Sequence, residues 1–355
     1  MKRLKGYSNK KSATANVVVF SLLALIVAAT GCTEAPKGIP YQVPDEVYKI
    51  RISTQMPVGH FLTDTTDFFC QRAEEMSDGH LKFTHYPAGQ IMTDKEVPDN
   101  IRLGTIEMSL AFMHMWVELL PKVALYYGPV LPDNLAYYER YNQYCLPAVA
   151  EILETDGNAK LVGGFLSCLD SGYITTRPIR KPDDFQGMKI RVATPILDPE
   201  VESLGGVPVI LSSADVYMAL SQGTIDGAQT ILTSFCARHY YEVAKYAISI
   251  YPTPLDFILV ANLDFWNSLP QDLQQVIQDS ADEAREYSIT ACIQADEDCR
   301  QYLREQGVDV YYPTGELRDA FMEIITEARY NWAVQRFGQE AVDEVIGWAE
   351  TTREE

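Results

Sequence analysis

The strongest constraint on the fold is a regular alternation of short apolar strands with amphipathic helices, which occurs twice along the chain. Each series places helices between strands, and this order is typical of a parallel sheet covered by helices. The first series is predicted at residues 49–53, 63–76, 81–86, 95–103 and 107–112, and the second at residues 189–192, 198–204, 207–210, 214–221 and 226–230. Two such units in tandem predict two similar α/β lobes with a cleft between them.

The last third of the chain has a helical pattern. Residues 270–305 contain no internal glycine or proline, and apolar residues recur there at helical spacing. Pro270 suits a first helical turn, and Gly307 suits a stop. One continuous helix would span about 54 Å, so we predict that it braces both lobes. A shorter helix is predicted at residues 317–337.

The first 32 residues have the layout of a bacterial secretion signal. Five basic residues precede an apolar run at residues 17–29, which is short for a membrane span. Small residues then lead to Cys32, as in a lipobox, although Ala29 stands where lipoboxes usually carry leucine. We predict a lipoprotein signal at residues 1–32, lipidation of Cys32, and a tether at residues 33–46 that holds the protein at the membrane.

This segment predicts a protein in the periplasm or at the cell surface. Ordinary signal cleavage, and an anchor helix that is never cleaved, are the alternatives to lipidation. The chain has 29 Lys and Arg against 49 Asp and Glu, and the signal contains five of the basic residues and none of the acids. The charge without the signal is therefore about −25, which argues against nucleic acid as a partner.

Six further cysteines follow Cys32 at irregular spacing and without a CxxC pair. Cys292 and Cys299 lie about 10 Å apart along one predicted helix, which is too far for them to bridge each other. Small buried thiols are predicted for most of the six, and other pairings stay open because an exported chain can form disulfides.

Short signatures of common enzymes are missing from the chain, which has no G-x-S-x-G, HExxH, GxxxxGK[ST] or GxGxxG pattern. The five histidines show no paired spacing that would suit a metal site. The sequence therefore predicts neither catalysis nor a metal or other cofactor.

Arg191 is the residue that points to a ligand. Lys189 and Arg191 fall on one face of a predicted strand, opposite Ile190 and Val192. Arg191 comes near the carboxyl end of that strand, where open α/β sheets bind ligands. Its planar guanidinium matches a carboxylate, although spacing alone would also suit an ordinary surface arginine.

Several stretches resemble the substrate-binding proteins of TRAP transporters, of the C4-dicarboxylate-binding (DctP) type. The matching stretches, which occur in family order, are residues 86–91, 102–108, 177–179, 187–192, 215–223, 225–227, 240–246 and 266–270. The resemblance implies a two-lobed α/β fold of the periplasmic-binding-protein kind (type II-like, a Venus flytrap) with a long helix spanning both lobes. It also implies that Arg191 forms a salt bridge with the carboxylate of a small organic acid, which the protein delivers to the TRAP membrane subunits.

From this resemblance we place lobe I at residues 47–167 plus about 257–295, and lobe II at residues 168–256 plus about 296–350. The sequence departs from the family pattern where many members carry a second arginine, because Asp170 and Ser171 stand there. Thr230 replaces an asparagine and Ser213 a phenylalanine. We therefore predict that the pocket is not a standard dicarboxylate pocket. A monocarboxylate is one candidate ligand, and an amine or hydroxyls of the ligand could contact Asp170.

The residues predicted to shape specificity from lobe II are Asp170, Ser171, Thr230 and Ser213. Phe112 and His60 are predicted to complete the site from lobe I. Two other functions stay open at this point. The same fold can present its closed form to a signalling receptor as a ligand sensor. A secreted enzyme is the weaker alternative, because no nucleophile–base pair is visible.

Overall fold

The computed structural model describes residues 46–251 and 254–354. The predicted signal at residues 1–32, the lipidation of Cys32 and all but the last residue of the tether lie outside the described residues.

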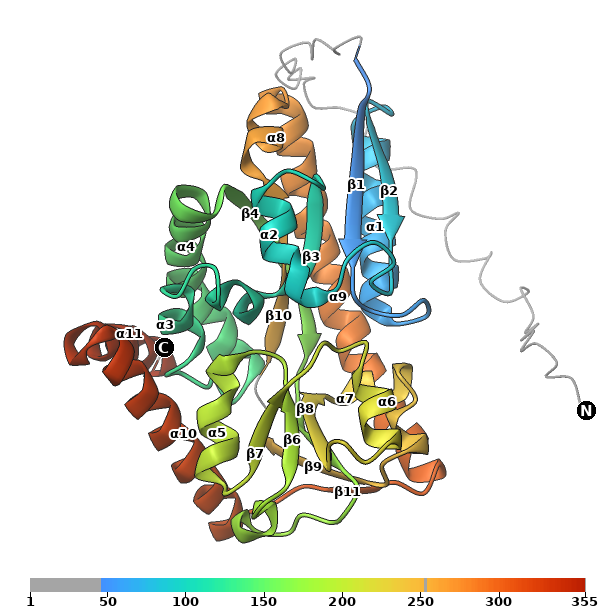
Figure 1. The fold of residues 1–355 in the computed structure, drawn as a ribbon. Helices are drawn as coiled ribbons and strands as arrows, with labels where there is room; N and C mark the ends of the chain where they lie inside the picture. Colours follow the sequence, from blue (N-terminus) through green and yellow to red (C-terminus); the bar gives the residue numbers. More distant parts are fainter. Residues whose placement is uncertain (1–45, 252–253, 355) are drawn as a thin grey trace, which may run out of the picture. The chain divides into compact units, whose positions relative to one another are not determined.

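The first lobe is built on a five-stranded sheet in the order β2-β1-β3-β10-β4 (Figure 1). Its strands are β1 (Tyr48–Thr54), β2 (Leu81–Tyr86), β3 (Met108–Phe112), β4 (Ala159–Cys168) and β10 (Leu255–Asn262). β1 pairs parallel with β2 and β3, whereas β10 runs antiparallel to both β3 and β4. The helices in this part of the chain are α1 (Phe61–Met76), α2 (Val97–Arg102), α3 (Val123–Tyr127), α4 (Leu135–Gly157) and α8 (Leu263–Ser268).

The second lobe is built on a six-stranded sheet in the order β11-β9-β5-β8-β6-β7. Its strands are β5 (Ser171–Thr175), β6 (Lys189–Val192), β7 (Val207–Ile210), β8 (Gly227–Ile231), β9 (Tyr246–Tyr251) and β11 (Asp309–Tyr311). The short helices α5 (Asp198–Ser203), α6 (Val216–Ser221) and α7 (Leu232–Ala237) belong to this lobe. β6 is parallel to both β7 and β8, so the carboxyl ends of these strands meet at one edge.

The predicted long helix is confirmed as α9 (Gln271–Glu305), which packs against α1 and β4 of the first lobe and against α7 and β11 of the second (Figure 1). Two further helices follow, α10 (Glu316–Phe337) and α11 (Gln339–Glu354). α10 packs on α5, and α11 packs on α4, so the C-terminal segment also touches both lobes. The chain therefore connects the lobes several times.

The apolar core runs without a break from one lobe into the other. Phe165 of β4, Tyr173 of β5 and Phe321 of α10 are fully buried in one cluster. Where β5 begins, the backbone of Gly172 passes so close to the carbonyl of Ile248 that a Cβ would overlap it. Only glycine allows this close pairing of β5 with β9.

One disulfide bond, Cys236–Cys299, joins α7 to α9 across a sequence separation of 63 residues. The side chains of Cys70, Cys145, Cys168 and Cys292 are buried. The prediction of small buried thiols for most of the six cysteines is thus confirmed.

Candidate functional site

Arg191 lies at the carboxyl half of β6 and is buried, with a relative exposure of 4%. Its Nε donates to the carbonyl of Leu211 at 2.9 Å, and its Nη1 donates to the carbonyl of Gln229 at 3.3 Å. No hydrogen bond within the described residues uses Nη2. Backbone carbonyls of two neighbouring segments therefore hold the guanidinium in place and leave one donor nitrogen for a ligand.

The guanidinium lines a cavity between the lobes with about 410 Å³ of atom-free space, mouth included. The first lobe contributes Gln55, Met56, Asp94, Phe112, Met115 and Phe257. The second contributes Arg191, Ala193, Ser213, Thr230, Ser234 and Arg238. A ligand held here would touch both lobes.

The structure brings four of the predicted site residues together at this cavity, namely Arg191, Thr230, Ser213 and Phe112. Phe112 ends β3, and its ring stacks on the ring of Phe257 in β10 with centroids 4.0 Å apart. The two rings form an apolar wall opposite the polar side chains of the second lobe.

His60 does not line this cavity but a different one, which Thr233 and Cys236 also line. Its Nε2 is 3.2 Å from Oγ1 of Thr233 in the other lobe, and its Nδ1 accepts from the backbone N–H of Leu62 at the start of α1. Burial and, to a smaller extent, the nearby charge of Arg238 together lower the pKa of His60 to about 3. The imidazole is therefore neutral at neutral pH and forms part of the contact between the lobes.

The structure places Ser171 and Asp170 away from Arg191. Ser171 lines two other cavities. Asp170 accepts a hydrogen bond from the hydroxyl of Ser249 and pairs with Arg300 at 3.3 Å. Its carboxylate thus already has a cationic partner within its own lobe.

The charges around the cavity compensate one another only in part. Burial lowers the pKa of Arg191, and Asp94 is the main charge that opposes this effect. Burial would raise the pKa of Asp94, but Arg191 and the backbone N–H of Ser213, which donates to Oδ2 at 3.2 Å, outweigh it and keep the carboxyl ionised. With Arg191 and Arg238 against Asp94, two positive charges face one negative charge, and the lining carries a net charge of +1.

Four polar residues of the cavity were not predicted from the sequence, namely Arg238, Asp94, Gln55 and Ser234. Arg238 donates from Nη2 to the carbonyl of Gln55 at 2.6 Å, a contact between the lobes. Nε2 of Gln55 is buried without a hydrogen-bond partner among the described residues. Gln55 directly follows β1 and Arg238 directly follows α7, so the rule that ligands lie beyond strand ends could have found Gln55. No comparable signal marks Asp94.

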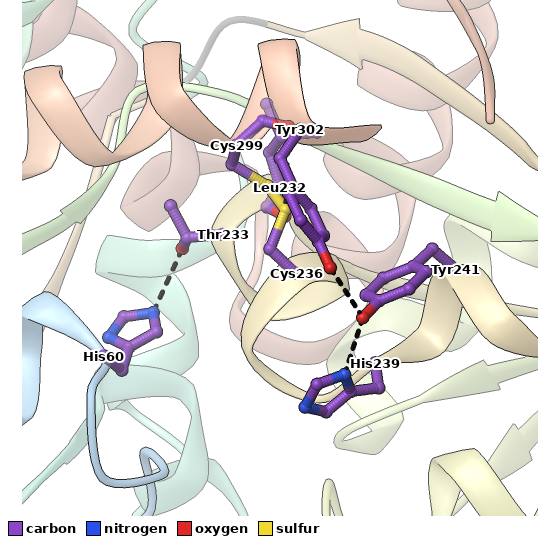
Figure 2. The surroundings of a disulfide bond; sticks show 8 residues. All are labelled: His60, Leu232, Thr233, Cys236, His239, Tyr241, Cys299 and Tyr302. Carbon is purple, nitrogen blue, oxygen red and sulfur yellow. Dashed lines mark hydrogen bonds between the residues drawn. A yellow bond between two sulfur atoms is a disulfide. The ribbon is translucent and has the colours of Figure 1, made fainter. Parts of the chain in front are cut away.

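The disulfide positions the helix that carries part of this site. Figure 2 shows Cys236 of α7 bonded to Cys299 of α9, with Thr233 reaching His60 one turn earlier. Ser234 of the same helix lines the cavity, and Arg238 is its C-terminal cap. The bond therefore ties the ligand-facing helix to the long helix that spans both lobes.

Two α/β lobes that enclose a cavity with a buried arginine define a solute-binding protein that closes around its ligand. The chain belongs to the bacterial extracellular solute-binding protein family 7 (DctP), whose model matches residues 52–334. It is thus a solute-binding protein of the TRAP-transporter type, as the sequence resemblance predicted.

Similar proteins share most of the length of this chain. It is 26% identical over 288 residues to the C4-dicarboxylate-binding periplasmic protein DctP of Rhodobacter capsulatus, covering 77% of this chain and 83% of that protein. It is 25% identical over 283 residues to the monocarboxylate 2-oxoacid-binding periplasmic protein all3028 of Nostoc sp., covering 75% of this chain and 74% of that protein. A TRAP periplasmic solute-binding protein from Desulfovibrio salexigens, solved with orotic acid, superposes with a TM-score of 0.80 at 20% identity and covers 86% of this chain and 99% of that one.

Within residues 46–251 and 254–354, no group of three or more His, Cys, Asp or Glu side chains is arranged to hold a metal ion. None of the helices in that part of the chain is both long and apolar enough to cross a membrane.

Proposed function

We propose that this protein captures a small organic acid with a single negative charge and delivers it to the membrane subunits of a TRAP transporter. The observation that carries the proposal is the cavity between the lobes, whose lining contains the buried Arg191 and has a net charge of +1. A singly charged anion neutralises this lining, whereas a dianion would leave an uncompensated negative charge in a buried place.

In this proposal the carboxylate of the ligand accepts from Nη2 of Arg191, with Arg238 as the second cation. Such charge-assisted hydrogen bonds are stronger than neutral ones. Gln55 offers an unpaired buried donor, and Thr230 and Ser213 offer hydroxyls for polar substituents. The wall formed by Phe112 and Phe257 suits an apolar or planar part of the ligand.

The names of similar proteins support an acid as ligand. The relatives described above bind C4-dicarboxylates or monocarboxylate 2-oxoacids, and the structure from Desulfovibrio salexigens holds orotic acid. These ligands share a carboxylate and differ in charge and shape. Members of this family bind solutes and do not transform them, and we propose the same for this chain.

The test is a thermal-shift screen of singly and doubly charged organic acids, followed by calorimetry on each acid that stabilises the protein. A bound ligand raises the apparent stability, so a monocarboxylate should give the largest shift. Arg191→Ala should weaken its binding by at least a hundredfold, while Arg102→Ala, on the surface of α2, leaves it unchanged. An unchanged affinity in Arg191→Ala, or a uniform preference for dicarboxylates, would contradict the proposal.

We also propose that a lipid on Cys32 anchors the protein outside the cytoplasmic membrane. The small residues before Cys32 support this, together with the periplasmic location of the named relatives. Mass spectrometry of the N-terminal peptide from the membrane fraction should detect an acylated cysteine. Release of Cys32→Ser into the soluble fraction is expected, and equal partitioning of both forms would contradict the anchor.

A further inference from the structure

A second cavity lies on the opposite side of the strand ends that form the acid site. Successive side chains of a strand point to opposite faces. Phe112, Phe257 and Thr230 face the Arg191 cavity, whereas their sequence neighbours Met113, Asp256 and Gln229 line the other one. The second cavity has about 640 Å³ of atom-free space, mouth included, and shares no lining residue with the first.

Aromatic and aliphatic side chains make up most of its wall. The rings come from Tyr126, Tyr127, Tyr138 and Tyr141, and Leu131 and Leu255 add aliphatic surface. The part of the cavity that water can enter has room for about three water molecules, which is about the space of one six-membered ring. An apolar wall of this kind favours a flat, largely apolar occupant.

Three buried polar atoms in the same wall have no hydrogen-bond partner among the described residues. They are Nδ2 of Asn142, Oγ of Ser171 and Oδ1 of Asp256, in residues with 7%, 2% and 6% relative exposure. Buried polar groups are nearly always hydrogen-bonded, so this group of donors and acceptors calls for a partner inside the cavity.

The charges of the wall exclude an acid. Oδ2 of Asp256 already pairs with Arg285 at 2.8 Å. Arg329 is engaged by the buried carboxylate of Glu200 and by the carbonyl of Gly128. No cation of the wall is left to neutralise an anion, and the unpaired oxygen of Asp256 would repel one.

We propose that this cavity is a second binding site, which takes an uncharged single-ring aromatic molecule with a hydroxyl group. The ring packs among the four tyrosines, and the hydroxyl donates to Asp256 and accepts from Asn142. Both lobes contribute to the wall, Met113 and Asn142 from the first and Ser171 and Gln229 from the second. An occupant therefore stabilises the closed form and strengthens acid binding at the other site.

Phenol and 4-bromophenol are suitable probes. Saturation-transfer NMR and calorimetry should detect phenol binding to the wild type. Soaked crystals should show a bromine anomalous peak inside the cavity, at the end of the ring that points away from Asn142. Asn142→Leu, which keeps the size of the side chain, should weaken phenol binding at least tenfold without changing acid affinity measured alone. Saturating phenol should tighten acid binding severalfold in the wild type and not in Asn142→Leu.

The Arg191→Ala variant distinguishes binding at this second cavity from binding at the acid site. Phenol should still bind to that variant, while benzoate, the charged analogue, should not. Absence of a bromine peak in the wild type, a cavity that holds ordered water only, or equal phenol binding in Asn142→Leu would overturn the proposal. The bromine peak in the wild-type crystal tests the proposal directly. The proposal can therefore be contradicted even if a variant fails to fold.

Discussion

Asp94 is the residue that sets the charge of the acid site. It is the only carboxylate among the residues that line the Arg191 cavity in the described part of the chain. Asp94→Asn keeps an oxygen that can accept from the N–H of Ser213 and raises the net charge of the lining from +1 to about +2. We expect the ratio of dicarboxylate to monocarboxylate affinity to rise at least tenfold in calorimetric titrations.

The matched control for Asp94→Asn is Asp170→Asn, which removes a carboxylate that is paired with Arg300 outside the cavity. The control should leave the ratio unchanged. A shift of equal size in both variants would show that long-range charge, and not the cavity lining, governs selectivity.

His60 makes acid binding depend on pH. Its pKa is about 3 in the closed form and returns toward about 6.5 when the lobes open and water reaches the ring. A lowered pKa in the closed form means that closure is unaffected above about pH 6.5 and is progressively disfavoured as the pH falls toward 3. We expect the acid affinity to fall about tenfold between pH 7.5 and 5.5 through His60 alone.

His60→Asn tests this effect, because asparagine still caps a helix but does not titrate. His114, whose pKa burial also lowers to about 3 and whose Nδ1 lies 3.2 Å from Oγ1 of Thr194 in the other lobe, retains its own contribution. In calorimetric titrations, the fall in acid affinity between pH 7.5 and 5.5 should therefore be about tenfold smaller for the variant than for the wild type. A pH profile identical to that of the wild type would contradict the role of His60.

At the residue scale, the sequence predicted the second-lobe half of the site better than the first-lobe half. Arg191 lies near the carboxyl end of an alternating strand, where the strand-end rule places ligands. Thr230 was predicted from the resemblance to the DctP family, in which an asparagine stands at this position. Asp94 lies in a 3₁₀ turn (Asp94–Glu96) that approaches Arg191 only when the two lobes meet. The contact of Asp170 with Arg300 depends on the register between β5 and α9, which no local pattern encodes.

At the scale of elements, the disulfide contributes to the stability of the fold and also holds α7, the helix that faces the cavity, in place. The Cys236–Cys299 bond closes a loop with a sequence separation of 63 residues, and removing a bond of this kind costs about 2–4 kcal/mol of unfolding free energy. We expect Cys236→Ser/Cys299→Ser to lose about this much in urea denaturation and to bind acid more weakly, because α7 carries Ser234 and Thr233.

A reducing agent provides the matched control for this prediction. It should lower the stability of the wild type to that of the double variant and should leave the double variant unchanged. Equal acid affinity in the oxidised and reduced wild type would show that α7 keeps its position without the bond.

Elements whose apolar residues recur at one regular spacing were predicted from the sequence. Elements whose residues indicate conflicting structures were not. Residues 270–305 repeat apolar positions at helical spacing without a breaker, and α9 forms there. α4 contains Pro147 in its interior, which local rules interpret as a helix end. β10 is apolar from Phe257 to Ala261 because both of its faces are covered, and such a run does not reveal the sheet to which it belongs.

At the scale of the whole molecule, the contacts between the lobes describe a closed form that a ligand would stabilise. Arg238 meets Gln55, Ser213 meets Asp94, and His60 meets Thr233 across the cavity. We expect small-angle scattering to show a smaller radius of gyration with the acid than without it. Arg191→Ala should show no acid-induced change, and superimposable curves for the free and bound wild type would contradict closure by the ligand.

The position of β10 has a consequence for how the cell makes this protein. β10 lies between β3 and β4, yet it follows the whole second-lobe segment from β5 to β9 in the chain. The central ladder of the first sheet cannot close until the chain has been made and delivered as far as Asn262. Until then β3 and β4 present open edges, which pair readily with other chains. Folding without aggregation therefore requires rapid arrival of the later residues or a chaperone that shields these two strands.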